Sequence, residues 1–140
     1  MTTLHHLNYL AVVVGAIAYF IIGSLWYSVL FGKVWMAANN IPTPTEEDKQ
    51  KMKKQMAPMM LTTLVCCFAA TVIVGCIEAL TGVHSVAIGV KAGLAAGVLT
   101  TMAIALNHMY LQKPFKLWVI DSAYHLCGLI ISGIILGMWA

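Results

Sequence analysis

A carboxylate and an imidazole stand inside the apolar run that ends the chain, FKLWVIDSAYHLCGLIISGIILGMWA. Asp121 and His125 are four residues apart, so in a helix they lie one above the other on the same face. Tyr124 and Gly128 fall on that face as well. A carboxylate and an imidazole in this arrangement could accept and release protons near neutral pH, or coordinate a bound solute.

The composition places these residues in a membrane protein. Hydrophobic residues make up 61% of the 140 residues and charged residues 9%, and the mean hydropathy is +0.87. Soluble domains are about half apolar and about a quarter charged. Four apolar segments, 10–31, 57–77, 92–112 and 117–139, are each long enough to cross a hydrocarbon core of about 30 Å as a helix. The sequence therefore predicts an all-α, polytopic membrane protein, a single domain built as a bundle of four transmembrane helices.

The lysines predict the orientation of these helices. The chain has 8 Lys and Arg residues, all of them Lys, and only Lys91 lies outside the first and third connections. By the positive-inside rule, those two connections face the cytoplasm and both termini lie outside. The net charge of +3 is modest and no cluster of Arg and Lys stands beside exposed aromatic residues, so we expect no nucleic-acid partner.

The first connection, residues 32–56, divides into a turn-rich half and a helical half. Pro42 and Pro44 cannot continue a helix. Thr45 followed by Asp48 has the pattern of a capping box, with acidic residues in the first turn where the helix dipole favours them. We therefore expect a helical extension from about residue 46 that reaches the membrane near Met56.

A depth scale of about 1.5 Å per helical residue brings polar side chains from three helices to one level. Asp121 and His108 each lie about 8 Å into the membrane from the nearest lysine, and Tyr27 lies about 9 Å deep. An ionised carboxylate at such a depth costs on the order of 3 kcal/mol, so it should face other helices or a cavity. We expect His108, Asn107 or Tyr27 to hold Asp121. The predicted ligand or proton site comprises Trp26, Tyr27, Asn107, His108, Asp121, Tyr124 and His125.

The role of this polar layer has alternatives. Interhelical hydrogen bonds in membranes contribute only about 0.6 kcal/mol each, which argues against burying an acid for stability alone. An Asp–His pair could nevertheless serve as structural glue that fixes which helices meet. Haem or metal ligation by His108 and His125, with neighbouring cysteines, lacks a supporting spacing, and a serine nucleophile lacks a supporting motif. We expect no metal, no cofactor and no catalytic residue.

Small residues predict close helix contacts in the third span. Gly89, Gly93 and Gly97 form a ladder that permits close approach either within the bundle or between protomers. Four helices enclose little volume, so we expect a homo-oligomer or a partner membrane protein in addition to the lipid bilayer.

Residues near the ends of the spans match the expected membrane surfaces. Glu78 and Lys91 could pair at the outer surface, for less than about 1 kcal/mol. Interfacial anchoring is a sufficient explanation for four aromatic residues, Tyr9, Trp35, Trp118 and Trp139.

Two stretches carry a family resemblance. The first is GSLWYSVLFGKVW (23–35), and the second is IDSAYHLCGLIISGIILGMW (120–139). They resemble the WY…LFGKxW and D-x-x-Y/H-type motifs of a bacterial family of small integral membrane proteins, the domain of unknown function 1761. The matching residues are Trp26, Tyr27, Phe31, Gly32, Lys33, Trp35, Asp121, Tyr124 and His125. The resemblance covers nearly the full chain and implies a four-helix domain in the bacterial cytoplasmic membrane, but no activity.

Three classes of function fit these observations, and we favour the first. In a small-solute or ion transport or permeation protein, Asp121 and His125 accept protons or coordinate the substrate, while Tyr27, Asn107 and His108 line the site. In a non-catalytic subunit or scaffold of a membrane complex, the glycine ladder binds the partner. The third class is a membrane enzyme or cofactor carrier. A hydrated cavity at the Asp121 layer would favour transport, and a dry, fully paired layer would favour the scaffold.

Overall fold

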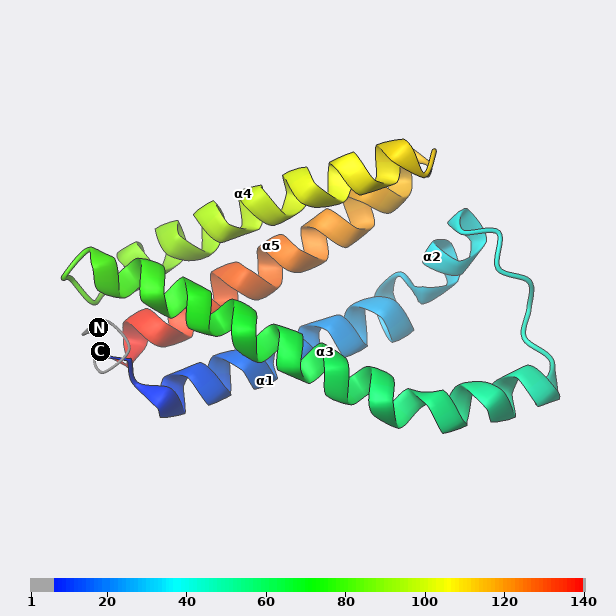
Figure 1. Ribbon diagram of the computed structural model, residues 1–140, viewed down its shortest axis with the longest axis horizontal. Coiled ribbons are helices and arrows are strands. Elements are labelled where there is room, and N and C mark those ends of the chain that lie inside the picture. The colour runs from blue at the N-terminus through cyan, green and yellow to red at the C-terminus, as the bar shows by residue number, and fades with distance from the viewer. Residues whose placement is uncertain (1–6, 140) are drawn as a thin grey trace.

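The computed structural model of the chain describes residues 7–139, and its regular elements are all helical (Figure 1). The elements in chain order are α1 (Tyr9–Leu25), η2 (Trp26–Leu30), α2 (Gly32–Ala38), α3 (Glu46–Leu80), α4 (Val86–Tyr110) and α5 (Phe115–Met138). Four segments, Tyr9–Leu30, α3, α4 and α5, are long and apolar enough to cross a membrane. The predicted all-α membrane fold with four spans is therefore confirmed.

The long helices run side by side, and the two ends of the bundle differ in composition. At one end α1 begins and α5 ends, and the turn between α3 and α4 lies there too (Figure 1). We call this the terminal end. At the opposite, lysine-rich end lie α2, the start of α3 and the turn between α4 and α5 (Figure 1).

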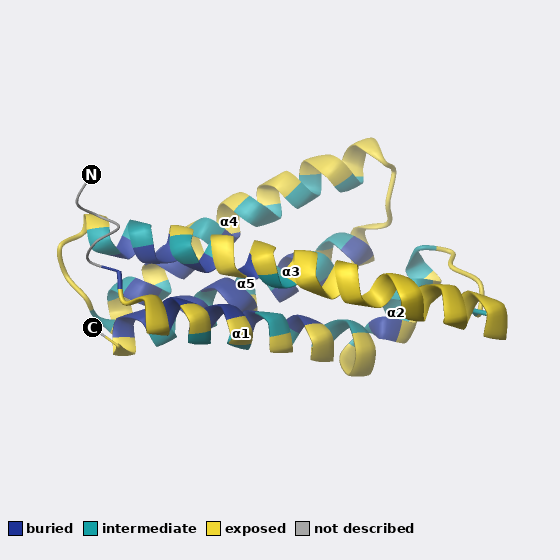
Figure 2. Ribbon diagram, turned by 60° about the horizontal axis from the view of Figure 1, so that its bottom comes forward, coloured by how far each residue is buried: buried dark blue, intermediate teal, exposed yellow. Residues whose placement is uncertain are grey.

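The outward faces of the long helices are apolar and exposed (Figure 2). Ile17, Phe68, Leu99 and Val119 have between 40% and 68% of their surface accessible in the isolated chain. Contiguous apolar surface of this extent is unfavourable in water and favourable against lipid chains. The exposed surface therefore supports the membrane assignment independently of helix length.

The starts of α1 and α3 follow from their capping residues. The side chain of Asn8 accepts hydrogen bonds from the N–H groups of Leu10 and Ala11 at the start of α1. Thr45 and Asp48 form the predicted capping box at the start of α3. The hydroxyl and N–H of Thr45 donate to the carboxylate of Asp48. These two bonds lower the pKa of Asp48 from its ordinary value. Because this start precedes the apolar segment, α3 extends to 35 residues.

The glycine ladder packs inside the bundle, against α5. A Cβ atom built on Gly89 would lie 1.9 Å from the carbonyl oxygen of Gly133, and one on Gly93 would lie 2.4 Å from that of Leu129. A Cβ on Gly97 would meet the Leu126 side chain at 2.7 Å. Of the two alternatives that the sequence left open, the ladder therefore serves contact within the chain.

The first span is interrupted where the sequence predicted a continuous helix over 10–31. The α-helical hydrogen bonding ends at Leu25, and a π-helical turn over Trp26–Leu30 follows, with the N–H of Phe31 donating to the carbonyl of Trp26 at 2.8 Å. A Cβ on Gly32 would lie 2.4 Å from the carbonyl oxygen of Tyr27, so this turn requires glycine at the start of α2. Extra residues in a helical turn change which face the following residues present.

The expected pair between Glu78 and Lys91 does not form. Glu78 is 2% exposed, and its carboxylate oxygen Oε1 lies 3.9 Å from Nδ1 of His84 instead. Lys91 is exposed and forms no ion pair with Glu78. The reason is helical geometry. Gly89 and Gly93 lie on the face of α4 that packs against α5. Lys91 is two residues from each of them, so its side chain lies on the opposite face of the helix.

Candidate functional site

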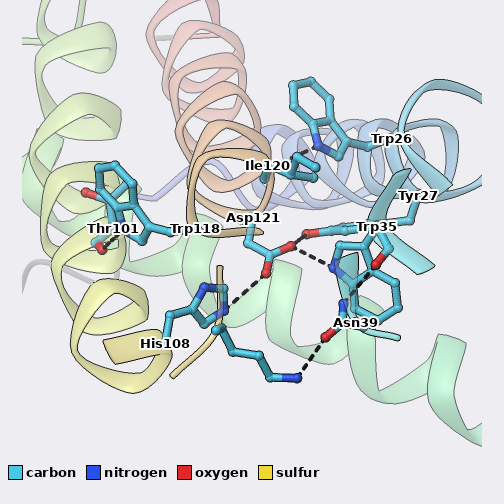
Figure 3. A network of polar contacts seen from close by, with 10 residues as sticks. Trp26, Tyr27, Trp35, Asn39, Thr101, His108, Trp118, Ile120 and Asp121 are labelled. Carbon is cyan, nitrogen blue, oxygen red and sulfur yellow. Dashed lines mark hydrogen bonds and ion pairs between the residues drawn. The ribbon is translucent and has the colours of Figure 1, made fainter. Parts of the chain in front are cut away.

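Asp121 contacts polar side chains from three parts of the chain, two through hydrogen bonds and one at an ion-pair distance (Figure 3). The hydroxyl of Tyr27, in η2, donates to Oδ1 over 2.7 Å, and the indole N–H of Trp35, in α2, donates to the same oxygen over 3.1 Å. Nε2 of His108, near the end of α4, lies 3.3 Å from Oδ2. The side chains of Asp121 and His108 are 19% and 15% exposed. The carboxylate, which belongs to α5, therefore connects η2 and α2 to α4 and α5.

A second layer of contacts fixes the position of Trp35. Its ring lies edge-on to that of Tyr27, with 5.8 Å between the ring centres. Its backbone carbonyl accepts a hydrogen bond from the side-chain amide nitrogen of Asn39. The side-chain oxygen Oδ1 of Asn39 accepts a hydrogen bond from Nζ of Lys113 over 2.9 Å (Figure 3). α2 is thereby tied to the turn between α4 and α5, which keeps the donors of Asp121 in place.

Trp26 and Asn107 are not among the partners of Asp121. The indole N–H of Trp26 donates to the backbone carbonyl of Ile120 over 3.1 Å, so Trp26 supports α5 beside the carboxylate. Asn107 is exposed. Adjacent residues of a helix point about 100° apart, and since His108 faces α5, Asn107 is turned away. The expectation that Asn107 lines the layer is therefore wrong.

His125 belongs to a neighbouring cluster of aromatic residues. Its Nδ1 lies 2.5 Å from the hydroxyl of Tyr19, a residue of α1 that the sequence reasoning did not single out. Tyr124 packs against His125 with 4.6 Å between ring centres, and its ring centre lies 5.4 Å from those of both Tyr19 and Tyr27. Its hydroxyl lies 3.9 Å from Sγ of Cys67 in α3. Tyr124 therefore connects the Asp121 layer to the Tyr19–His125 pair.

Two cavities adjoin this aromatic cluster. Tyr27 and Tyr124 line one of about 530 Å³, whose other wall carries Met52, Met56, Met59 and Met60 of α3. A second, of about 340 Å³, is lined by Tyr19, Tyr124, His125 and residues of α3 that include Cys67. Tyr124 lines both cavities, whereas Asp121 lines neither. Volumes of this size accommodate small molecules.

Some buried polar atoms near Asp121 have no hydrogen-bond partner among the described residues. In residues 7–139, no group of three or more His, Cys, Asp and Glu side chains could hold a metal ion. Buried polar atoms without a partner in that part of the chain include Nδ1 of His108 and Oγ of Ser122. A buried imidazole nitrogen without a partner is able to bind water or a solute. His108 therefore has one nitrogen beside Asp121 and one without a protein partner among the described residues.

Sequence signals for the missed residues exist in two places. Tyr19 precedes Tyr27 by eight residues, which in a regular helix is about 80° around the axis and still within the width of one inward face. Trp35 stands in the motif GSLWYSVLFGKVW, yet interfacial anchoring explained it without a binding partner. Its contact with Asp121 depends on the π-turn, which the hydrophobic pattern did not indicate.

The comparisons with known proteins give a family and no activity. A family model described as Protein of unknown function (DUF1761) matches residues 10–137. No curated protein and no solved structure matches the chain.

Proposed function

Because the chain belongs to the family described as Protein of unknown function (DUF1761), we propose its function from the geometry of its own site. We propose that it is a transport or permeation protein for a small solute or ion, in which proton movement involves the carboxylate of Asp121.

The observation that carries this proposal is a continuous series of titratable side chains in the membrane interior. His108, Asp121 and Tyr27 are in contact through hydrogen bonds and an ion-pair distance. The ring of Tyr27 packs against the ring of Tyr124, and Tyr124 packs in turn against Tyr19, which contacts His125. Ionisable residues inside a membrane are costly, and they commonly serve proton relays or substrate pathways.

The cavities beside this series suggest what the solute is like. Methionine, phenylalanine and tyrosine dominate the walls of the larger cavity, so the solute is small and mainly apolar, with few hydrogen-bonding groups. In this proposal Tyr124 contacts the solute in both cavities, His125 and Tyr19 bind its polar group, and Asp121 exchanges a proton through Tyr27 or His108.

Orientation and assembly complete the proposal. The lysine-rich end faces the cytoplasm of a bacterial cell and the terminal end faces outside, as the positive-inside rule favours. The methionine wall of the larger cavity belongs to the largely exposed first half of α3. A second copy of the chain, or a partner membrane protein, packed against that half would enclose the pathway.

Proton flux into vesicles tests the proposal. The purified protein is reconstituted into vesicles that contain a pH-sensitive dye, and a potassium diffusion potential drives protons inward. We expect a protein-dependent flux that Asp121→Asn reduces to the level of empty vesicles, since an amide does not accept a proton at neutral pH. Asp48→Asn is the matched control, because Asp48 is exposed and outside the apolar segment. A wild-type flux equal to that of empty vesicles contradicts the proposal.

The contacts of Asp121 also favour a second candidate, a scaffold in which Asp121 has only the structural role of holding the helices together. Asp121 accepts two hydrogen bonds and has His108 at an ion-pair distance, and a carboxylate paired in this way can specify which helices meet. This structural role predicts that Asp121→Asn lowers the free energy of unfolding and that the wild-type protein shows no proton flux. It also predicts that another membrane protein co-purifies with the wild-type protein.

A further inference from the structure

A second buried acid lies at the terminal end, in the last turn of α3. Glu78 is 2% exposed, and its Oε1 is a buried oxygen without a hydrogen-bond partner among residues 7–139. The backbone of Ser85 bonds to the carboxylate, yet burying a carboxylate with one oxygen left unbonded remains unfavourable. A bound guest that supplies a positive charge or a donor would remove this cost.

Glu78 lines a cavity of about 370 Å³ at this end of the bundle. His84, in the turn between α3 and α4, lies across from it, and the 3.9 Å between His84 Nδ1 and Oε1 is too long for a hydrogen bond. The other lining residues within the described range 7–139 are Leu7, Asn8, Gly75, Leu136 and Trp139. None of these five is charged, so Glu78 is the acidic group among the described lining residues.

The walls of this cavity are held by contacts that do not involve a guest. Asn8 caps α1 with its side-chain oxygen, and its amide donates to the backbone carbonyl of Trp139 over 3.1 Å. Leu7 packs on Gly75, where an added Cβ would lie 2.8 Å from a methyl carbon of the leucine. The start of α1, the end of α5 and α3 therefore form a cavity with fixed walls.

We propose that this cavity binds a small monovalent organic cation, such as an amine or a quaternary ammonium ion. The Glu78 carboxylate supplies the counter-charge, and Trp139, which also lines the cavity, carries an indole, a group that attracts cations over its ring face. Leu7 and Leu136 provide apolar contacts for the alkyl groups. One carboxylate and one imidazole fall short of the ligand number that Zn²⁺ or Ca²⁺ prefers, so a metal ion fits less well. The inference does not depend on Asp121 or on the proposed transport.

Isothermal titration of the purified protein with benzyltrimethylammonium chloride tests this inference. At a pH well above the ordinary pKa of histidine, we expect saturable binding with one site per chain. Glu78→Gln should weaken binding by more than about tenfold because it removes the counter-charge. Trp139→Leu should weaken it by about fivefold through loss of the cation–π contact. Glu47→Gln, an exposed acid of the same helix, is the matched control and should bind as the wild type does.

Several outcomes would overturn the inference. No saturable binding of the organic cation by the folded wild-type protein excludes the site. Equal binding by Glu78→Gln, or by Trp139→Leu if the former variant does not fold, places any bound cation elsewhere. Binding of ZnCl₂ that requires both Glu78 and His84, without binding of the organic cation, would replace the proposed ligand class with a metal ion.

Discussion

The two oxygens of Asp121 have unequal surroundings. Oδ1 accepts from both Tyr27 and Trp35, whereas Oδ2 has only His108, at 3.3 Å. A carboxylate oxygen offers two lone pairs, so Oδ1 is saturated and Oδ2 retains capacity. In the proposed transport, Oδ2 is the oxygen at which a proton or a solute would bind. The second ring nitrogen of His108, Nδ1, lacks a partner among the described residues.

The donors of Asp121 predict the effect of single substitutions on stability. Tyr27→Phe and Trp35→Phe each remove one bond to Oδ1, and each should lower the free energy of unfolding by about 1 kcal/mol, within the range found for interhelical hydrogen bonds in membranes. Unfolding in mixed detergent micelles measures this loss. Tyr110→Phe is the control, because Tyr110 is 84% exposed. If Tyr27→Phe is as stable as the control variant, the bond to Asp121 does not form in the membrane.

The individual residues of the site were only partly predictable from the sequence. Depth along each helix brought Asp121, His108 and Tyr27 to one level because that argument needs only the helical rise. Which residue of a pair faces inward depends on rotation about the helix axis, and depth gives no rotation. The wrong assignment of Asn107 and the omission of Tyr19 both follow from that gap.

Among the elements, α4 and α5 approach most closely where glycines face one another. The carbonyl of each glycine in the pair Gly89 and Gly133 occupies the place that a Cβ on the other would take. Small residues give transmembrane helices this close contact, since lipid supplies no hydrophobic drive for helices to associate. The pair fixes the register of α5, and with it the height of Asp121 relative to His108.

Alanine substitutions separate a rigid contact from a flexible one. Gly89→Ala places a methyl group against backbone, and we expect it to lower the free energy of unfolding by about 3 kcal/mol. Gly97→Ala meets the end of the Leu126 side chain, which can turn away, so its cost should be at most about 1 kcal/mol. Unfolding of both variants in mixed micelles gives the comparison. Equal losses would mean that the α4–α5 distance differs from the one described.

The elements themselves were more predictable than their junctions. The apolar runs indicated four spans, and Thr45 with Asp48 indicated the start of α3, because length and capping chemistry are local properties. The π-turn at Trp26–Leu30 depends on contacts with α5, including the bond from Trp26 to the carbonyl of Ile120. No local pattern in WYSVL distinguishes that turn from regular helix.

Across the whole molecule, buried polar groups lie on inner faces from one end of the bundle to the other. The Asp121 layer stands toward the lysine-rich end, and the Tyr19–His125 pair follows it. Thr71 and Ser132, both fully buried, come next, with Thr71 donating to Ser132 and Ser132 to the carbonyl of Gly15. Glu78 stands at the terminal end. A dry structural core would gain little from so many polar side chains.

The orientation of this series in the membrane is open to direct measurement. In a background where the four native cysteines are replaced by alanine, Asn40→Cys and Val83→Cys mark the two ends. Asn40 and Val83 are both exposed. A membrane-impermeant thiol reagent added to intact bacterial cells should label the Val83→Cys protein and leave the Asn40→Cys protein unlabelled. The reverse pattern would place the lysine-rich end outside.

A high-resolution crystal structure of the protein in lipid would show directly whether the Asp121 layer is hydrated or occupied. The transport account predicts ordered water or a bound solute at Oδ2 of Asp121 and Nδ1 of His108, continuing to the cavity beside Tyr124 and His125. A dry layer, with Oδ2 bonded only to protein and no density in that cavity, would contradict the proposed transport function. Asp121 would then have only a structural role in holding the helices together.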